Sequence, residues 1–382
     1  MQLLLPKEIK KCLEALTAAG FEAWCVGGAV RDMIMGRIPG DFDVTTNAHP
    51  DEIISLFDKT VPTGLKHGTV TVIIEKMPIE VTTYRTDGNY SDHRSPDSVE
   101  YVSSLEDDLQ RRDFTVNAIC CDVNGKIHDP LNGTNDIKSK ILRTVGNPEV
   151  RFTEDALRIM RLFRFSSQLD FTIEENTLLA AIKLSYLLRE ISVERIYKEL
   201  TRLICGPAPQ NADSLFYSGA LNYLGLNKMK LGTVLNDCPP CFSLRFAVLC
   251  KKSGVNANII LKNLKSDKTS ETDTETYLKL LSMKSDTRQD IKRMLNIGGI
   301  EKCRNILAFY GHSPATLDDI LKNKEPYNKS MLAVNGTDIK NIGINGEKIG
   351  QIIDYLTDTV IEDPPKNNRE ALIKAAKDNA DL

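Results

Sequence analysis

The sequence lacks the features of a membrane or secreted protein. No apolar run in its 382 residues approaches the roughly 20 residues of a membrane-spanning helix. The first residues, Met1 to Pro6, have neither the charged segment nor the cleavage site of a secretion signal. Internal repeats and low-complexity segments are also missing. These absences predict a cytoplasmic protein with no membrane partner.

The sequence has no excess of positive charge. Its formal net charge of -3 at pH 7 argues against indiscriminate binding to nucleic acid, which usually needs a strongly basic surface. The local charge differs from this average, because the only charged residues between Asp155 and Asp170 are Arg158, Arg161 and Arg164. A basic stripe of this kind can guide a polyanion to one face of an acidic protein.

Cysteines are present, but not in the spacing of a disulfide framework. The nine cysteines are irregularly spaced, and most lie in apolar segments such as 118–121, which predicts reduced thiols in the core. The exception is Cys238-Pro-Pro-Cys241, a single Cys-x-x-Cys without a second pair or a nearby histidine. Ordinary thiols are the favoured interpretation of this pair, and a metal or redox site is the alternative.

The pattern of apolar residues changes along the chain. With 41% hydrophobic residues in 382, the chain can bury a sizeable core, and its length favours about two to four domains. The segment 6–20 has helical periodicity, and β-rich runs at 69–75 and 79–84 predict a hairpin that turns at Lys76-Met77-Pro78. Sheet signals end and helical periodicity takes over near residue 150. The predicted fold class is therefore α+β, with the sheet in the N-terminal part.

A glycine turn and a pair of carboxylates form the most informative pattern. The predicted order is strand, glycine turn, helix and strand, at residues 22–26, 27–28, 29–35 and 41–45. Gly27-Gly28 lets backbone amides approach a phosphate, and Asp41 and Asp43, at i and i+2 of a strand, can bind divalent metals from one face. Together they predict metal-dependent phosphoryl or nucleotidyl transfer, although each half alone can be turn chemistry. Glu80, on the neighbouring β-rich run, is either a third acidic contributor or a solvent-facing residue.

Two further charged clusters follow. Arg111-Arg112-Asp113 is expected to open a helix that carries Asn117 on the same face as Asp113, which suggests a binding site; a surface capping cluster is the simpler alternative. In the second cluster, Asp155 and Arg158 are expected on one face of a helix over 155–165. Their carboxylate and guanidinium can match the amino group and ring acceptors of cytosine or adenine, whereas uracil and guanine present a carbonyl to the carboxylate.

Asp155 has a simpler interpretation as well. An acidic residue stabilises the first turn of a helix, here after the predicted N-cap Thr153. That interpretation covers Asp155 alone. It leaves Arg158, Arg161 and Arg164 unexplained on an otherwise apolar helix, where a buried cation needs an anionic partner.

These motifs, in this order, resemble the class II tRNA nucleotidyltransferases, which are the CCA-adding enzymes, and the related bacterial poly(A) polymerases. The segments that carry the resemblance are Gly27 to Asp32, Asp41 to Asp43, Arg111 to Asn117, His128 to Gly133, Glu154 to Arg161 and Ser192 to Arg195. The resemblance is close over roughly the first two hundred residues and loose beyond them, where segments 332–340 and 343–350 are similar to the family's tail.

The resemblance implies an architecture of head, neck, body and tail. A nucleotidyltransferase head, with a mixed or antiparallel sheet and flanking helices, is expected at residues 1–148. Three all-helical parts follow it: a neck that selects the base at 149–206, a body at 207–330, and a tail that binds tRNA at 331–382. Ser192 to Arg195 is expected to be an N-capped helix start that supports the neck.

The resemblance also implies roles for individual residues. Asp41 and Asp43 would be catalytic and would bind two Mg²⁺ ions. The substrate CTP or ATP would contact Gly28, Arg31, Arg112, Asp155, Arg158, Arg161 and Arg164. Asp113 would support the junction of head and neck. The partner would be the 3′ end of tRNA, held from the side of the acceptor stem and T-arm.

The predicted function is the template-independent addition and repair of the 3′-terminal CCA of tRNA, with release of pyrophosphate. Residues 63–70 resemble CCA-adding enzymes rather than poly(A) polymerases, the main alternative. Residues 87–94 resemble the flexible loop of CCA-adding and A-adding enzymes, so we expect addition of the terminal A. Enzymes that add only CC or only A are further alternatives. A non-catalytic RNA-binding relative is a last one, against which the intact Asp41 and Asp43 argue.

Overall fold

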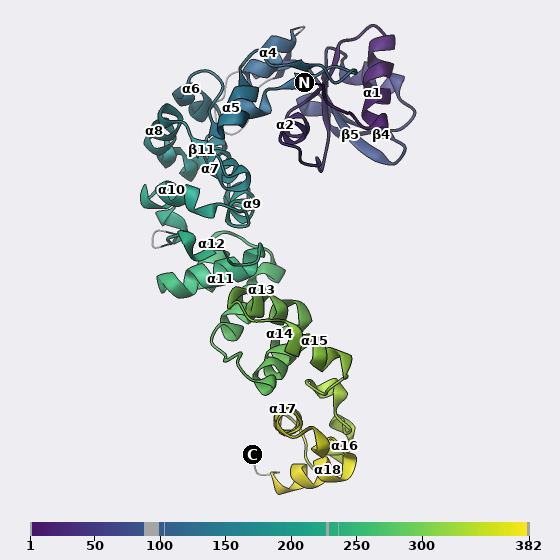
Figure 1. The fold of residues 1–382 in the computed structure, drawn as a ribbon, viewed down its shortest axis with the longest axis vertical. Coiled ribbons are helices and arrows are strands. Elements are labelled where there is room, and N and C mark those ends of the chain that lie inside the picture. The colour runs from purple at the N-terminus through teal and green to yellow at the C-terminus, as the bar shows by residue number, and fades with distance from the viewer. Residues whose placement is uncertain (1, 88–98, 103, 227–228, 236, 380–382) are drawn as a thin grey trace. The chain divides into compact units, whose positions relative to one another are not determined.

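The computed structural model describes residues 2–87, 99–102, 104–226, 229–235 and 237–379. The chain divides into two compact units, Met1–Lys230 and Leu231–Leu382 (Figure 1). The first unit combines a sheet with helices, and the described residues of the second unit form helices without strands. The predicted α+β fold is thereby confirmed. In the described ranges, no helix has both the length and the apolar character that a membrane crossing requires.

The first unit is built on a seven-stranded mixed sheet. Its strand order is β3-β4-β5-β2-β1-β8-β9, and β2 and β5 are parallel whereas the other neighbours are antiparallel. These strands are Ala23–Val26 (β1), Asp43–Thr46 (β2), Thr60–Gly64 (β3), Thr69–Ile74 (β4), Met77–Thr83 (β5), Cys120–Cys121 (β8) and Ile127–His128 (β9). Two short ladders stand apart from it: β6 (Arg85–Asp87) with β7 (Val99–Tyr101), and β10 (Ile141–Leu142) with β11 (Thr172–Ile173).

The turn of the hairpin formed by β4 and β5 begins one residue earlier than predicted and is one residue shorter. Glu75 and Lys76 form the turn, both with positive φ, of 50° and 77°. Two left-handed residues match the right-handed twist of the strands, which explains this tight turn. Pro78 therefore belongs to β5 and not to the turn. It is tolerated there because β2 pairs with β5 only from Glu80 onward, so that β5 has a single neighbour at Pro78.

Helices cover the sheet and continue the chain beyond it. The helices of the sheet region are α1 (Lys7–Ala18), α2 (Gly28–Ile34), α3 (Pro50–Leu56), α4 (Leu105–Gln110) and α5 (Gly133–Ser139). Helix α1 packs on β1 and buries Ile9, Cys12, Leu13 and Leu16, so its predicted apolar stripe is confirmed. Burial contributes about 1.5–3 kcal/mol for each of the aliphatic side chains in this stripe.

The remaining helices fall into the two units. The first unit adds α6 (Pro148–Glu154), α7 (Leu157–Leu169), α8 (Glu175–Lys183), α9 (Val193–Ile204) and α10 (Asp213–Tyr217). The second contains α11 (Phe242–Ser253), α12 (Ala257–Asn263), α13 (Lys268–Leu280), α14 (Arg288–Phe309), α15 (Ala315–Lys322), α16 (Gly336–Asn341), α17 (Lys348–Glu362) and α18 (Arg369–Asp378). The first unit thus contains both the predicted head and the predicted neck. The boundaries at residues 148, 206 and 330 stay predictions.

The structure describes all nine cysteines, and none of them forms a disulfide, which agrees with the predicted reduced thiols. Cys238 is buried and Cys241 is half-buried at the start of α11. The buried Arg245 donates hydrogen bonds to the carbonyls of Cys238 and Pro239, at 2.7–3.1 Å. The backbone of the Cys-x-x-Cys turn is therefore held by the guanidinium of Arg245.

Candidate functional site

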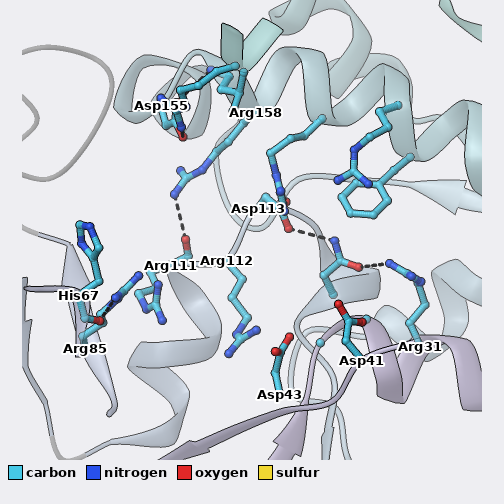
Figure 2. Close-up of a pocket in the computed structure, with 18 residues that line it drawn as sticks. Arg31, Asp41, Asp43, His67, Arg85, Arg111, Arg112, Asp113, Asp155 and Arg158 are labelled. Carbon is cyan, nitrogen blue, oxygen red and sulfur yellow. Dashed lines mark hydrogen bonds and ion pairs between the residues drawn. The ribbon is translucent and has the colours of Figure 1, made fainter. Parts of the chain in front are cut away.

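One pocket in the first unit gathers all nine residues predicted to bind nucleotide or metal (Figure 2). Its volume is about 840 Å³, within the usual range for small-molecule sites. The predicted residues on its lining are Gly28, Arg31, Asp41, Asp43, Arg112, Asp155, Arg158, Arg161 and Arg164. The lining also includes Gly27, His67, Arg85, Arg111, Asp113, Asn117, Leu157, Phe165 and Arg195. Figure 2 shows Asp41 and Asp43 on one side and Asp155 and Arg158 on the other.

The glycine turn forms where it was predicted, between β1 and α2. Gly27 has φ 79° and ψ -135°, a conformation in which other residues are strained. A Cβ atom at Gly27 would lie 3.4 Å from Nη1 of Arg112 and 3.8 Å from Oδ2 of Asp43. The missing side chain therefore keeps the backbone of the turn close to both charged groups.

Asp41 and Asp43 both reach the pocket, but only Asp43 lies in a strand. The predicted strand 41–45 is observed as Asp43–Thr46. The reason is the length of its neighbour, since β1 ends at Val26, opposite Asp43, where the chain turns at Gly27. Asp41 precedes the strand and is exposed, whereas Asp43 is half-buried.

The carboxylates at this end of the pocket repel one another, which favours the protonated form of Asp43. Burial raises the pKa of Asp43 to about 6, the negative charges of Glu80 and Asp41 add to the rise, and Arg112 opposes it. Glu80 lies directly opposite Asp43 on the parallel strand β5. Over the described residues, no three His, Cys, Asp or Glu side chains are grouped to hold a metal. Glu80 is exposed, and its negative charge contributes to the raised pKa of Asp43.

The side chain of Arg31 is fixed in the wall of the pocket by contacts with Asp32 and with the more distant Asn117. Its guanidinium is buried, with the side chain 9% exposed. It donates to Oδ1 of Asp32 at 2.7 and 2.9 Å and to Oδ1 of Asn117 at 2.7 Å. Asn117 comes from a short 3₁₀ helix, Thr115–Asn117, far from α2 in sequence.

The Arg111-Arg112-Asp113 cluster ends a helix, contrary to the prediction that it starts one. Helix α4 stops at Gln110, and Arg111 is its C-cap. The buried Asp108 accepts hydrogen bonds from Arg111, at 2.6 and 2.9 Å, and from Arg112, at 3.0 Å. Burial disfavours this carboxylate, but the charges of Arg112 and Arg111 lower the pKa of Asp108 below its usual value. Cations are favourable at the negative end of a helix, which explains the position.

Asp113 connects this cluster to helix α7. Its Oδ2 accepts from Nη2 and Nε of Arg161 at 2.6 and 2.9 Å, and its Oδ1 accepts from Nδ2 of Asn117 at 3.1 Å. Burial acts against the charge, yet Arg161 and Asn117 lower the pKa of Asp113 to about 2. The predicted proximity of Asp113 and Asn117 is confirmed, although no continuous helix joins them.

The helix predicted over 155–165 is broken at Asp155. Helix α6 ends at Glu154, Asp155 is extended with φ -136° and ψ 103°, and α7 begins at Leu157. Thr153 is not an N-cap, because its hydroxyl donates to the Glu149 carbonyl inside α6. The carboxylate of Asp155 accepts from the amide of Leu157 at 3.0 Å and from Nη2 of Arg195 at 3.2 Å. It therefore does stabilise a helix start, that of α7.

Asp155 and Arg158 take different protein partners. Arg158 donates to Oε2 of Glu154 at 2.5 Å, to the Arg151 carbonyl at 3.1 Å and to the Arg111 carbonyl at 3.2 Å. Burial raises the pKa of Asp155, and Arg195 opposes the rise. The predicted pairing on one helix face is thus wrong, since the helix break separates the two residues. Both still face the pocket.

The other arginines of α7 also have carboxylate partners within the protein. Arg161 pairs with Asp113, and the buried Arg164 pairs with the buried Glu199 of α9 at 2.5 Å. The prediction that these buried arginines need anionic partners is therefore satisfied by carboxylates of the protein itself. Arg161 keeps a side-chain exposure of 34%, whereas that of Arg164 is 7%.

Several lining residues were not predicted as site residues. Arg195, expected only to support the neck, extends from α9 to Asp155, and α9 begins after Ser192 as predicted, though the Ser192 side chain makes no cap hydrogen bond. Arg85 donates to the carbonyl of His67. Phe165 had the pattern of an ordinary core residue. Most of the predicted loop, residues 88–94, lies outside the described residues.

The sequence matches two families of known proteins. Residues 23–143 match the "Poly A polymerase head domain", and residues 170–227 match the "Probable RNA and SrmB- binding site of polymerase A". The first match contains Asp41, Asp43 and Arg112.

Named relatives align along nearly the whole chain or along about half of it. It is 36% identical over 406 residues to a CCA-adding enzyme of Ligilactobacillus salivarius, covering 98% of this chain and 97% of the relative. A CCA-adding enzyme of Geobacillus thermodenitrificans is 50% identical over 213 residues, covering 56% of this chain and 53% of the relative. The crystal structure of the Bacillus stearothermophilus CCA-adding enzyme in complex with CTP superposes with a TM-score of 0.81 at 32% identity, covering 98% of both chains. The Thermotoga maritima CCA-adding enzyme complexed with tRNA shares the fold, with a TM-score of 0.63 at 18% identity over 97% of this chain and 94% of that one.

Proposed function

The chain belongs to the family of CCA-adding enzymes, and from this premise we propose that it adds C, C and A to the 3′ end of tRNA, from CTP and ATP, in a single site. The proposal of a single site is supported by the pocket, because one pocket has the Asp41 and Asp43 carboxylates on one side and Asp155 with Arg158 on the other. One set of reacting groups and one base-recognition surface would then serve all three additions.

Asp41 and Asp43 would hold Mg²⁺. The residues fit such an ion, because burial and the facing charges of Asp41 and Glu80 raise the pKa of Asp43, and a bound cation would offset both effects. When bound, Mg²⁺ supplies charge neutralisation on the triphosphate and activation of the RNA 3′-hydroxyl. Carboxylate oxygens are the ligands this ion prefers.

The protein's own groups at this end would bind and orient the triphosphate. The backbone at Gly28 can approach the phosphates because the turn carries no side chain, and Arg31 presents a guanidinium fixed by Asp32 and Asn117. Arg112 lies beside Asp43 and Gly27, where it would neutralise further negative charge. Positioning and charge are most of what nucleotidyl transfer requires of a protein.

Asp155 and Arg158 would select the base. The carboxylate of Asp155 accepts a hydrogen bond and the guanidinium of Arg158 donates, which suits the amino groups and ring acceptors of cytosine and adenine. Uracil and guanine would place a carbonyl against the carboxylate and leave buried polar groups unpaired. Arg161, partly exposed to the pocket, is proposed to contact the nucleotide as well. Arg164, which lines the pocket but is more deeply buried and pairs with Glu199, is proposed as a further nucleotide contact.

The partner is the 3′ end of tRNA, and we propose contact from the acceptor-stem and T-arm side through the predicted body and tail. We also place the enzyme in the cytoplasm, where tRNA is its substrate. The full-length similarity to CCA-adding enzymes favours complete CCA addition over poly(A) synthesis, over addition of CC or A alone, and over a non-catalytic role.

A single assay tests this proposal. Purified protein receives tRNA transcripts that end before CCA, after C and after CC, with Mg²⁺ and each labelled nucleotide separately, and products are separated at single-nucleotide resolution. We expect C, C and A to be added in order and synthesis to stop there. Long A tails would indicate a poly(A) polymerase. Activity only on transcripts ending in CC would indicate an A-adding enzyme.

A further inference from the structure

Phe165 lies at the centre of three guanidinium groups. The Cζ atoms of Arg164, Arg31 and Arg161 are 3.8, 5.3 and 5.4 Å from the centre of its ring. Arg31 belongs to α2, whereas the other two belong to α7 with Phe165 itself. The ring lines the pocket but is only 8% exposed. It therefore contacts arginines from two separate elements.

The orientation of the ring is fixed by the core. Phe114, fully buried, meets Phe165 edge-on, with ring centres 5.8 Å apart and an angle of 80° between the rings. Such an arrangement is favourable because the positive ring edge faces the negative ring face. The ring cannot turn away from the arginines without disturbing this contact.

A chain of hydrogen bonds runs past the same ring. Arg31 donates to Asn117 at 2.7 Å, Asn117 donates to Asp113 at 3.1 Å, and Asp113 accepts from Arg161 at 2.6 Å. Arg31 and Arg161, the two ends of this chain, are also two of the three cations beside Phe165. These guanidiniums repel one another, and the face of an aromatic ring attracts each of them.

We propose that Phe165 is a positioning residue that holds the guanidiniums of Arg31 and Arg161 in place to receive the triphosphate of the incoming nucleotide. This inference rests on the proposed function. The ring does not react. It keeps two cations together in advance of binding, so that less ordering and less mutual repulsion oppose the arrival of the anion.

The test compares loss of the ring with its retention. Phe165→Leu removes the ring at similar volume, and Phe165→Tyr keeps it. Phe163→Leu is the matched control, because Phe163 is a fully buried phenylalanine of the same helix. Dissociation constants for CTP and for CMP are measured on the full chain with Mg²⁺, together with kcat and KM for C addition to tRNA lacking CCA, and thermal unfolding of each variant.

We expect Phe165→Leu to weaken CTP binding by about 4- to 25-fold, since the ring's contacts with Arg31 and Arg161 are lost at about two- to five-fold each. CMP lacks the two outer phosphates, so its affinity should change less than about two-fold, and KM should rise more than kcat falls. Phe165→Tyr and Phe163→Leu should bind CTP within about two-fold of the wild type.

Three results would overturn the proposal. They are unchanged CTP binding in a folded Phe165→Leu, equal damage in Phe165→Tyr, and an equal loss of CMP and CTP affinity. Phe165→Met, which also removes the ring, replaces Phe165→Leu with the same expectations if the leucine variant does not fold. If the wild type binds CTP but adds no nucleotide, the proposed function is wrong. The role of Phe165 is then decided by the dissociation constants for CTP and CMP alone.

Discussion

Replacing Arg195 should make base selection depend on pH. Asp155 is mostly buried, with 18% of its side chain exposed, and burial already raises the pKa of its carboxyl. Arg195, at 3.2 Å, opposes that rise. In Arg195→Gln the pKa of Asp155 should therefore rise further. A protonated Asp155 no longer serves as a pure acceptor for the amino group of cytosine or adenine.

The sign and size of the effect follow from the same contacts. Selection by Asp155 requires the carboxylate, so it is present above the pKa and lost as the pH falls through it. One charge-assisted hydrogen bond is worth about 1.5–3 kcal/mol, which corresponds to about 10- to 150-fold in the preference for CTP over UTP. The variant should approach wild-type selection at high pH and lose it towards low pH, over a range where the wild type still selects.

The assay is the ratio of kcat/KM for CTP and UTP on tRNA lacking CCA, measured from about pH 6 to about pH 9. Lys198→Gln is the control, because Lys198 is an exposed cation on the same helix α9. The reasoning is refuted if Arg195→Gln keeps the wild-type ratio at every pH, or if Lys198→Gln changes it equally.

Three further outcomes are expected. Deletion of residues 88–94 should leave CC addition largely intact and strongly reduce addition of the final A; a deletion variant that completes CCA at the normal rate would contradict the predicted role of this loop. Arg164→Met should lower the free energy of unfolding by about 3–5 kcal/mol, because Glu199 is then buried without its partner, and Arg164→Met with Glu199→Met should recover most of the loss in urea unfolding. The pKa of Glu325 is lowered to about 2, and the largest cause is the hydrogen bond that Glu325 accepts from Arg288. The ionised Glu325 therefore stabilises the fold at pH values above 4.5, its ordinary pKa, and this stabilisation is lost as the pH falls towards 2. Acid unfolding followed by circular dichroism should show this dependence in the wild type and a reduced one in Glu325→Gln.

Local patterns predicted the parts of the site that depend on short stretches of chain. The glycine turn and the carboxylates that follow it are set by neighbouring strands, and their convergence follows from the pairing of β1, β2 and β5. The start of β2 was misplaced because it depends on where β1 ends. The residue at which β2 begins is therefore set by the partner strand β1, and the sequence around Asp41 does not reveal it.

The helix break at Asp155 escaped prediction for a similar reason. A threonine followed by acidic residues and a periodic apolar run is typical of one helix start, and this pattern predicts Thr153 as the cap. In the structure Asp155 is held by Arg195, 40 residues away in sequence, and the chain leaves helical geometry to reach it. Arg195 and Phe165 were likewise missed as site residues, because their contacts come from other elements and no local spacing reports them.

The central claim is that Asp41 and Asp43 serve every addition in one site. Its most direct test is the pair of variants Asp41→Asn and Asp43→Asn, assayed on tRNA transcripts that end before CCA and after CC. Asp51→Asn, at an exposed position on α3, is the control. We predict that both variants lose C and A addition alike, by at least about a hundred-fold, because metal-assisted charge stabilisation is worth several kcal/mol, while tRNA affinity stays within about two-fold. Loss of only one of the two nucleotides, or normal addition by either variant, would contradict the single site.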